Sequence, residues 1–137
     1  MKDSYKIEEI TPGMSASMSH LVTDKDVRNF AEVSGDHNPV HLDEEYAKHS
    51  RFGQRIAHGL FGASFFSGLF GTRLPGRGCV YAAQNLKFRR PVYIGDTVTA
   101  TITVLSVDVA KKRVTFSTVC TVEGKDVIIG DAEIFIP

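Results

Sequence analysis

The sequence has little cysteine and no excess of either charge, and each shortage argues against a class of protein. Lys and Arg together number 16, as do Asp and Glu, so the formal net charge is zero. A neutral chain produces no overall field that attracts nucleic acid or an anionic membrane. Cys79 and Cys120 lie in strand-like apolar stretches, where reduced buried thiols are commoner than a disulfide. We therefore expect no disulfide framework and neither nucleic acid nor membrane as a partner.

Long hydrophobic runs and targeting signals are also missing. The most apolar stretch, 56–74, is interrupted by four glycines and by His58 and Arg73, which makes it a poor membrane span. Residues 1–9 mix acidic and basic side chains without an apolar segment, so neither a secretory signal nor a transit peptide is indicated. We expect a cytoplasmic protein in which residues 1–137 form a single domain.

The hydropathy pattern of the first half predicts one strand followed by helices. Residues 14–22 alternate between apolar and polar side chains for most of their length, which is typical of a strand with one buried face. Thr23 and Asp26 have the spacing of a capping box, and the helix that they begin is expected to end at Ser34-Gly35. A long helix is predicted from about residue 58 to 73. Its apolar side chains cover most of its circumference, so we place it in the core.

The chain after Pro75 is predicted to consist mainly of strands. The expected strands are 80–88, 97–104, 113–122 and 127–136, and polar turns join the last three. Their lengths and turns favour an antiparallel meander. A curved antiparallel sheet with one long buried helix across it satisfies this order of elements. The predicted fold class is α+β.

The densest group of polar residues in apolar surroundings is the stretch 34–43. Pro39 has no amide hydrogen, so we expect irregular backbone from Asp36 to His41, before a short helix at 44–49 that Asp43 caps. A loop stiffened by proline can keep a carboxylate and an imidazole at a fixed separation, as acid–base catalysis requires. The alternative is that these polar side chains only form Asx turns and satisfy local backbone groups.

Motifs for a metal, a covalent nucleophile or a phosphate are not found. His37 and His41 are four residues apart, but Pro39 between them breaks the helix that would align them as metal ligands. The sequence has no Gly-x-Ser-x-Gly turn, no cysteine beside a histidine and no phosphate-binding glycine pattern. We expect no metal and no cofactor, and we favour acid–base chemistry on a bound water over covalent hydrolysis.

The start of the long predicted helix is a second candidate region. The free amides of a helix N-terminus suit a carbonyl oxygen that gains negative charge, and Gly59 lets a ligand approach closely. Ser64 can instead donate to a carbonyl one turn earlier, and His58 can act only as a capping residue. Arg89 and Arg90 either form a solvated strand edge or meet an anionic ligand tail.

Four motifs in the same order resemble those of the MaoC-like family, the (R)-specific enoyl-CoA hydratases. They are Ser-Gly-Asp-His-Asn-Pro-Val-His-Leu-Asp at 34–43, Arg-Ile-Ala-His-Gly at 55–59 with Ser64, Leu-Pro-Gly at 74–76, and Leu-Lys-Phe-Arg-Arg-Pro-Val-Tyr-Ile-Gly-Asp at 86–96. Any one of them is weak, but the ordered set covers nearly the whole chain. The resemblance implies a hot-dog fold, in which a curved antiparallel sheet wraps a long helix. It also implies a homodimer with active sites at or near the subunit interface.

The resemblance assigns roles to particular residues. Asp36 and His41 are expected to be the catalytic pair, and the amide of Gly59 is expected to take the thioester carbonyl. We further expect Ser64 and Asn38 to orient the site, and His58, Arg89 and Arg90 to bind the substrate.

The implied reaction is the reversible addition of water to a trans-2-enoyl-CoA, which yields an (R)-3-hydroxyacyl-CoA; some relatives of this kind feed polyhydroxyalkanoate synthesis. The acyl-CoA thioester is the expected partner. Three alternatives remain open: a hot-dog acyl-CoA thioesterase, a dehydratase that acts on carrier-protein thioesters, and a non-catalytic module that binds acyl thioesters.

Overall fold

The strands of the computed structural model, which describes residues 2–137, form one antiparallel sheet. Their order across the sheet is β1-β4-β5-β6-β2, and the short β3 also pairs with β6. The expected meander of the last three strands is confirmed, because β4 pairs with β5 and β5 with β6. The bounds are β1 (Ser15–Leu21), β2 (Val80–Gln84), β3 (Lys87–Phe88), β4 (Thr97–Asp108), β5 (Arg113–Val122) and β6 (Lys125–Phe135).

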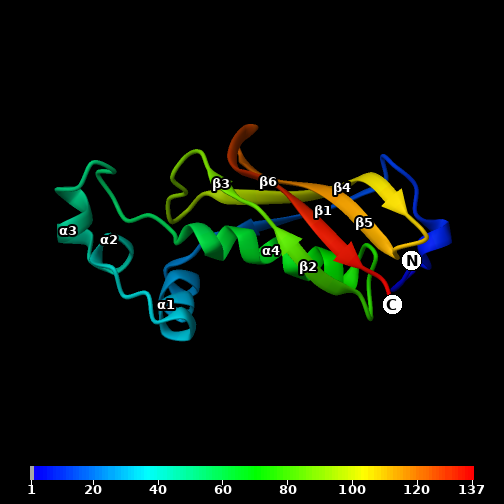
Figure 1. Cartoon of the computed structure of the whole chain (residues 1–137). Helices are drawn as coiled ribbons and strands as arrows, with labels where there is room; N and C mark the ends of the chain where they lie inside the picture. Colours follow the sequence, from blue (N-terminus) through cyan, green and yellow to red (C-terminus); the bar gives the residue numbers. More distant parts are fainter. Residues whose placement is uncertain (1) are drawn as a thin grey trace.

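The long helix α4 (Gly59–Thr72) lies along one face of this sheet (Figure 1). Phe66 and Phe70 on the helix are fully buried in the core, and burying each such side chain stabilises the fold by about 1.5–3 kcal/mol. The alternation seen in the sequence of β4 is confirmed, since Val98, Ala100 and Ile102 are each at most 1% exposed. Bulges in β4 and β6 bend the strands. The α+β hot-dog architecture is thus as predicted.

Local signals predicted the first N-terminal helix, Asp24–Ser34, correctly. Thr23 Oγ1 accepts from the Asp26 amide and the Asp26 carboxylate accepts from the Thr23 amide, which is the predicted capping box. Gly35 ends the helix with φ of 79°, a left-handed conformation that glycine adopts without strain. The remaining helices are α1 (Asp24–Ser34), α2 (Pro39–Leu42), α3 (Glu44–Lys48) and the 3₁₀ turn η1 (Ile7–Glu9).

Three sequence-based expectations need correction. Residues 39–41 are not irregular: Pro39 begins the short helix α2, because the first helical position needs no amide hydrogen. The strand expected at 80–88 is divided into β2 and β3, since the backbone of Asn85 turns aside to bond Asp131 on β6. Helix α4 is not covered all round, because the sheet packs on one side only and leaves Leu60 59% exposed.

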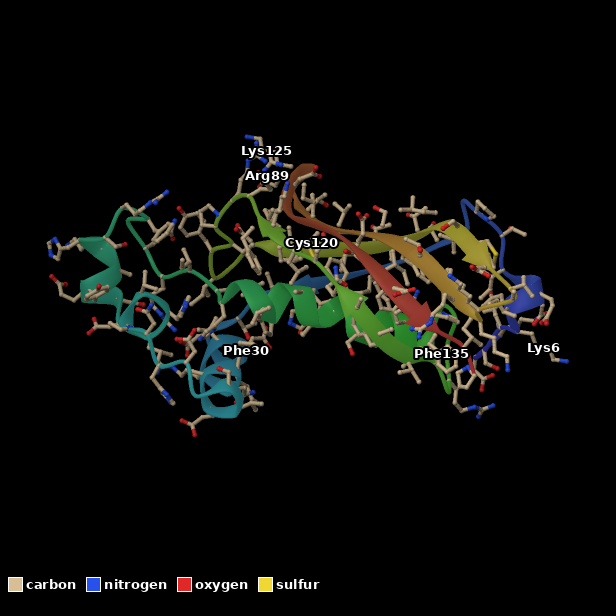
Figure 2. The ribbon with its side chains drawn as sticks, viewed as in Figure 1. Lys6, Phe30, Arg89, Cys120, Lys125 and Phe135 are labelled. Atoms are coloured by element: carbon tan, nitrogen blue, oxygen red, sulfur yellow. The ribbon has the colours of Figure 1, made fainter. Side chains whose placement is uncertain are left out.

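The helices α1, α2 and α3 gather at one end of the molecule, and both termini lie at the other end (Figure 1). Phe30 extends from α1 towards α4 (Figure 2), where its ring packs 5.8 Å from that of Phe61. No helix among residues 2–137 has the length and hydrophobicity needed to cross a membrane. This arrangement brings the loop after α1 to the N-terminus of α4.

Candidate active site

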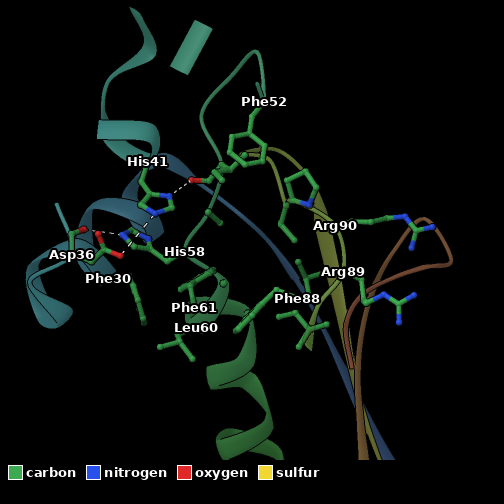
Figure 3. A pocket seen from close by; sticks show the side chains of 18 of the residues that line it. Phe30, Asp36, His41, Phe52, His58, Leu60, Phe61, Phe88, Arg89 and Arg90 are labelled. Atoms are coloured by element: carbon green, nitrogen blue, oxygen red, sulfur yellow. Dashed lines mark hydrogen bonds and ion pairs between the residues drawn. The ribbon is translucent and has the colours of Figure 1, made fainter. Parts of the chain in front are cut away.

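A cavity of about 650 Å³ opens between the α1–α3 end and the start of α4 (Figure 3). Among the residues predicted for the site, Asp36, His41, His58, Gly59, Arg89 and Arg90 all line it, whereas Asn38 and Ser64 do not. The rest of the wall is largely apolar, with Phe30, Phe52, Phe61, Phe88, Val98 and Ile128. The cavity therefore combines one polar corner with walls suited to a hydrocarbon chain.

The imidazole of His41 is held in one tautomer. Its Nδ1 lies 2.7 Å from the backbone oxygen of Ile56. Because a carbonyl oxygen only accepts hydrogen bonds, Nδ1 carries the proton and donates. In the neutral ring Nε2 then keeps its lone pair. The side chain is buried, so this arrangement presents a fixed proton acceptor to the cavity.

The two carboxylate oxygens of Asp36 have different surroundings. Oδ1 accepts from the Asn38 amide at 3.1 Å, which is the Asx turn considered from the sequence. Oδ2 faces His41 Nε2 at 3.9 Å, too far for a direct hydrogen bond. A water placed about 2.8 Å from both atoms would bond to each at an angle of roughly 90°. One oxygen therefore fixes the loop, and the other is free to share a water with His41.

His58 supports both members of this pair. Its ring stacks on that of His41, with centroids 3.8 Å apart and planes inclined by 27°. Its Nε2 donates to the backbone oxygen of Asp36 at 3.0 Å. Burial lowers the pKa of His58 below its ordinary value, more than the Asp36 contact raises it, so the ring is neutral at pH 7. His58 was expected to bind the substrate, but its Nε2 is bonded to Asp36 and its Nδ1 is buried without a partner within residues 2–137. This placement favours a supporting role.

A metal is not favoured by the same three residues. Ligand atoms of Asp36, His41 and His58 lie within 4.8 Å of one another. An imidazole binds a metal along its ring plane, however, and two stacked rings do not direct their lone pairs at a single ion. His37, the other histidine of the loop, is exposed and contacts Glu32 instead. That the protein uses no metal stays a prediction.

The N-terminus of α4 is open to the cavity. His58 occupies the capping position without a side-chain hydrogen bond to the first turn, so the first amides of the helix have no capping acceptor. The ring of Phe88 lies directly against Gly59: a Cβ on this residue would be 2.6 Å from Phe88 Cε1. Glycine is therefore needed for the ring and the helix start to come this close.

Ser64 and Asn38 lie outside the cavity. The hydroxyl of Ser64 donates to the Phe61 backbone oxygen at 2.5 Å, which is the local alternative considered for it, and its side chain is exposed. The structure does not bring Ser64 to Asp36 and His41. Asn38 caps α2 by accepting from the Val40 amide at 3.2 Å, and so holds the turn that carries His41.

Arg89 and Arg90 extend away from Asp36 and His41 (Figure 3). Arg90 Nη1 donates to the Asp126 backbone oxygen at 2.8 Å. Arg51 also lines the cavity. None of these three arginines forms an ion pair with a carboxylate within residues 2–137. Arg89 and Arg90 therefore place unpaired positive charge on the side of the cavity away from Asp36 and His41, and Arg51 adds a third unpaired guanidinium to the lining.

Residues 8–126 match the family model described as the MaoC like domain. The chain belongs to the MaoC-like family. This MaoC-like chain is 51% identical to an (R)-specific enoyl-CoA hydratase of Rhodospirillum rubrum, over 97% of the chain and 92% of the relative. It is 40% identical to a 3-hydroxybutyryl-CoA dehydratase of Methylorubrum extorquens, over 95% and 83%. The solved (R)-hydratase of Aeromonas caviae, involved in PHA biosynthesis, superposes with a TM-score of 0.92 at 37% identity, over 95% and 99%.

Two features of this MaoC-like site were not assigned from the sequence. The aromatic walls come from four separate segments, and only folding brings them together. Arg55 lies within a motif but received no role, although its Nε donates to the His41 backbone oxygen at 2.6 Å. Its charge directly before the apolar pair Ile56-Ala57 was the available signal. Burial raises the pKa of the Cys120 thiol to about 12, so this cysteine offers no thiolate nucleophile.

Proposed function

We propose that this chain is an (R)-specific enoyl-CoA hydratase, which adds water reversibly to a trans-2-enoyl-CoA to give an (R)-3-hydroxyacyl-CoA. The observation that carries the proposal is the 3.9 Å separation between Asp36 Oδ2 and His41 Nε2 in a cavity beside the N-terminus of α4. The high identity to a relative named for this activity supports it. We take Asp36 and His41 as the catalytic residues.

The chemistry follows from where the groups lie. The thioester carbonyl accepts from the Gly59 amide, which makes C3 of the conjugated substrate electrophilic. The water between Asp36 and His41 gives up one proton to this pair as its oxygen bonds to C3. The electrons of the C2–C3 double bond move onto the carbonyl oxygen and form an enolate. The carbonyl re-forms as C2 takes the proton back from the pair. The hydroxyl at C3 and the proton at C2 are both delivered from the same face of the double bond, so the addition is syn.

The substrate occupies the cavity with its two ends in different surroundings. The apolar walls receive the acyl chain, which is the part that loses hydration on binding. Arg51, Arg89 and Arg90 are suited to the phosphate groups of CoA, because a guanidinium binds phosphate oxygens in pairs. The product is the kind of monomer that polyhydroxyalkanoate synthesis consumes, and we propose this as one use of the activity.

We also propose the setting in which the enzyme works: a cytoplasmic homodimer in which residues 1–137 of each protomer form one domain. Support for the dimer comes from the uncovered face of α4 and from β2, which is exposed along most of its length and, within residues 2–137, pairs only with β6. A free strand edge and an uncovered helix face are both surfaces that a second copy can cover.

Asp36→Asn and His41→Ala test the assignment. Each is expected to keep the circular dichroism spectrum and to lower the rate of crotonyl-CoA hydration by about 10²–10⁴, the usual contribution of a positioned acid–base group. The loss of enoyl absorbance gives the rate, and chiral analysis gives the hand of the product. His49→Ala, at an exposed histidine directly after α3 that does not line the cavity, serves as the control with unchanged activity. Near-normal turnover in either site variant refutes the assignment.

The same assays separate the alternatives. A thioesterase releases free thiol from a saturated acyl-CoA, whereas a hydratase removes enoyl absorbance without releasing thiol. A carrier-protein dehydratase prefers an enoyl group on its carrier protein over the same group on CoA. A binding module holds the thioester and turns over neither substrate.

A further inference from the structure

One buried arginine lies directly behind the candidate active site. Arg55 is 8% exposed, in the segment between α3 and α4, and it does not line the cavity. A guanidinium loses much hydration when it is buried, so it needs a hydrogen-bond acceptor and a negative charge beside it in the fold. Arg55 has two partners, which lie on different elements. One of them is the turn that carries His41.

The first partner is the backbone of His41. Arg55 Nε donates to the His41 oxygen at 2.6 Å. The next residue, Ile56, accepts from His41 Nδ1 at 2.7 Å and donates its own amide to Val40 at 3.3 Å. Consecutive residues therefore hold both the backbone and the ring of His41. A shift of the turn that carries His41 breaks at least one of these bonds.

The second partner is Asp24, the first residue of α1. Its Oδ1 lies 2.7 Å from Arg55 Nη2. The guanidinium of Arg55, and then that of Arg28, hold the pKa of Asp24 below its ordinary value, so the carboxylate is charged at neutral pH. Helix α1 is itself fixed by the buried side chains of Val27 and Ala31. Arg55 thus links two parts of the protein. One is helix α1, whose position is set by core packing, and the other is the turn that carries His41, the proposed base.

We propose that Arg55, anchored by Asp24, is a positioning residue that keeps His41 in the orientation and tautomer needed for catalysis. The inference rests on the proposed role of His41 in hydration. Without Arg55 the His41 oxygen loses its donor, and the turn is free to move relative to Ile56. The Nδ1–H bond to Ile56 is then no longer enforced. A ring protonated on Nε2 instead cannot accept a proton from the water that it shares with Asp36.

Kinetics of Arg55→Met, Arg55→Lys and Asp24→Asn test the proposal in the full-length protein. Arg55→Met is expected to lower kcat for crotonyl-CoA at least about ten-fold, because small misplacements of a catalytic group are costly. The KM is expected to stay within about two-fold, since Arg55 does not line the cavity. Arg55→Lys lacks the Nε donor and loses kcat too. Asp24→Asn keeps the Arg55–His41 bond and shows a smaller loss.

Arg28→Met is the matched control, because Arg28 is the other arginine that bonds Asp24 but lies on the surface, 56% exposed. Its kcat and KM are expected to match the wild type. An equal loss of kcat in Arg28→Met and Asp24→Asn contradicts the proposal, because Asp24 would then act without Arg55.

Nitrogen NMR of the histidine rings supplies a readout that a merely structural role does not move. In the wild type His41, assigned by comparison with His41→Gln, is expected to show the Nδ1–H tautomer; in Arg55→Met and Arg55→Lys the Nε2–H form is expected to appear. An unchanged tautomer and unchanged kcat in Arg55→Met overturn the proposal. Should Arg55→Met not fold, an unchanged tautomer and an unchanged kcat in both Arg55→Lys and Asp24→Asn overturn the proposal. A wild type without hydratase activity refutes the proposed function, while the tautomer still decides what Arg55 does.

Discussion

At the scale of single residues, the position of a few protons decides what the site can do. His41 donates through Nδ1 to Ile56 and therefore accepts through Nε2, which faces Asp36 Oδ2. His58 stays neutral because burial lowers its pKa, so it adds no second positive charge when His41 takes up a proton. The polar corner of the cavity can thus cycle one proton without moving a side chain.

Gly59→Ala tests how closely substrate and aromatic wall approach the helix start. The new Cβ would lie 2.6 Å from the Phe88 ring, so either the ring or the first turn of α4 must shift. We expect kcat/KM for crotonyl-CoA to fall by about 10²-fold, as on loss of one oxyanion donor, because a shifted first turn moves the amide of residue 59 away from the thioester carbonyl. In a Phe88→Ala background the same change is expected to cost less. Equal losses in both backgrounds would show that the ring is not the obstacle.

At the scale of elements, β6 organises one side of the sheet. It pairs with β5 along one edge and with both β2 and β3 along the other. The interruption between β2 and β3 falls at Asn85, which lies against Gly130 of β6. Because β3 contains Phe88 and leads directly into Arg89 and Arg90, its pairing with β6 sets where one wall of the site lies.

Gly130→Ala is expected to be strongly destabilising. A Cβ at this position would lie 2.0 Å from the backbone oxygen of Asn85, and a backbone atom cannot move aside as a flexible side chain does. Overpacking of this kind costs typically about 1–3 kcal/mol, and urea unfolding of the purified variant measures it. Gly62→Ala, where the Cβ meets only the end of the Ile128 side chain at 3.0 Å, is expected to cost less. An unfolding midpoint equal to that of the wild type would contradict this prediction, because it would show that the backbone at Asn85 can move away from β6 without loss of stability.

At the scale of the whole molecule, the sheet covers one side of α4 and leaves the other side uncovered. Leu60, Ser64, Ser67, Gly68 and Gly71 lie on this exposed side. Apart from Leu60, these residues are small or polar, so the exposed side of α4 is less apolar than the side that packs on the sheet. This exposure gives Ser64 a place in the proposed dimer rather than beside Asp36 and His41.

Gly68→Glu tests the dimer without disturbing the protomer. Nothing lies within 4 Å of a Cβ at Gly68, so the chain by itself tolerates a side chain there. We expect light scattering to give twice the chain mass of 15.1 kDa for the wild type and a protomer mass for the variant, because a buried, unpaired carboxylate opposes association. Lys48→Glu, an exposed charge change on α3, is expected to leave the mass unaltered. A dimeric Gly68→Glu protein would place the interface elsewhere.

The sequence by itself determined the features that depend on neighbouring residues. The capping box at Thr23 and the alternation in β4 are local patterns, and the ordered motifs indicated the family. Contacts between distant segments were decided only by tertiary structure. His41 meets Ile56, 15 residues away, and Arg55 meets Asp24, 31 residues away. Neither pairing leaves a periodic signal in the chain, so the tautomer of His41 and the role of Arg55 appear only after the sheet and helices have packed.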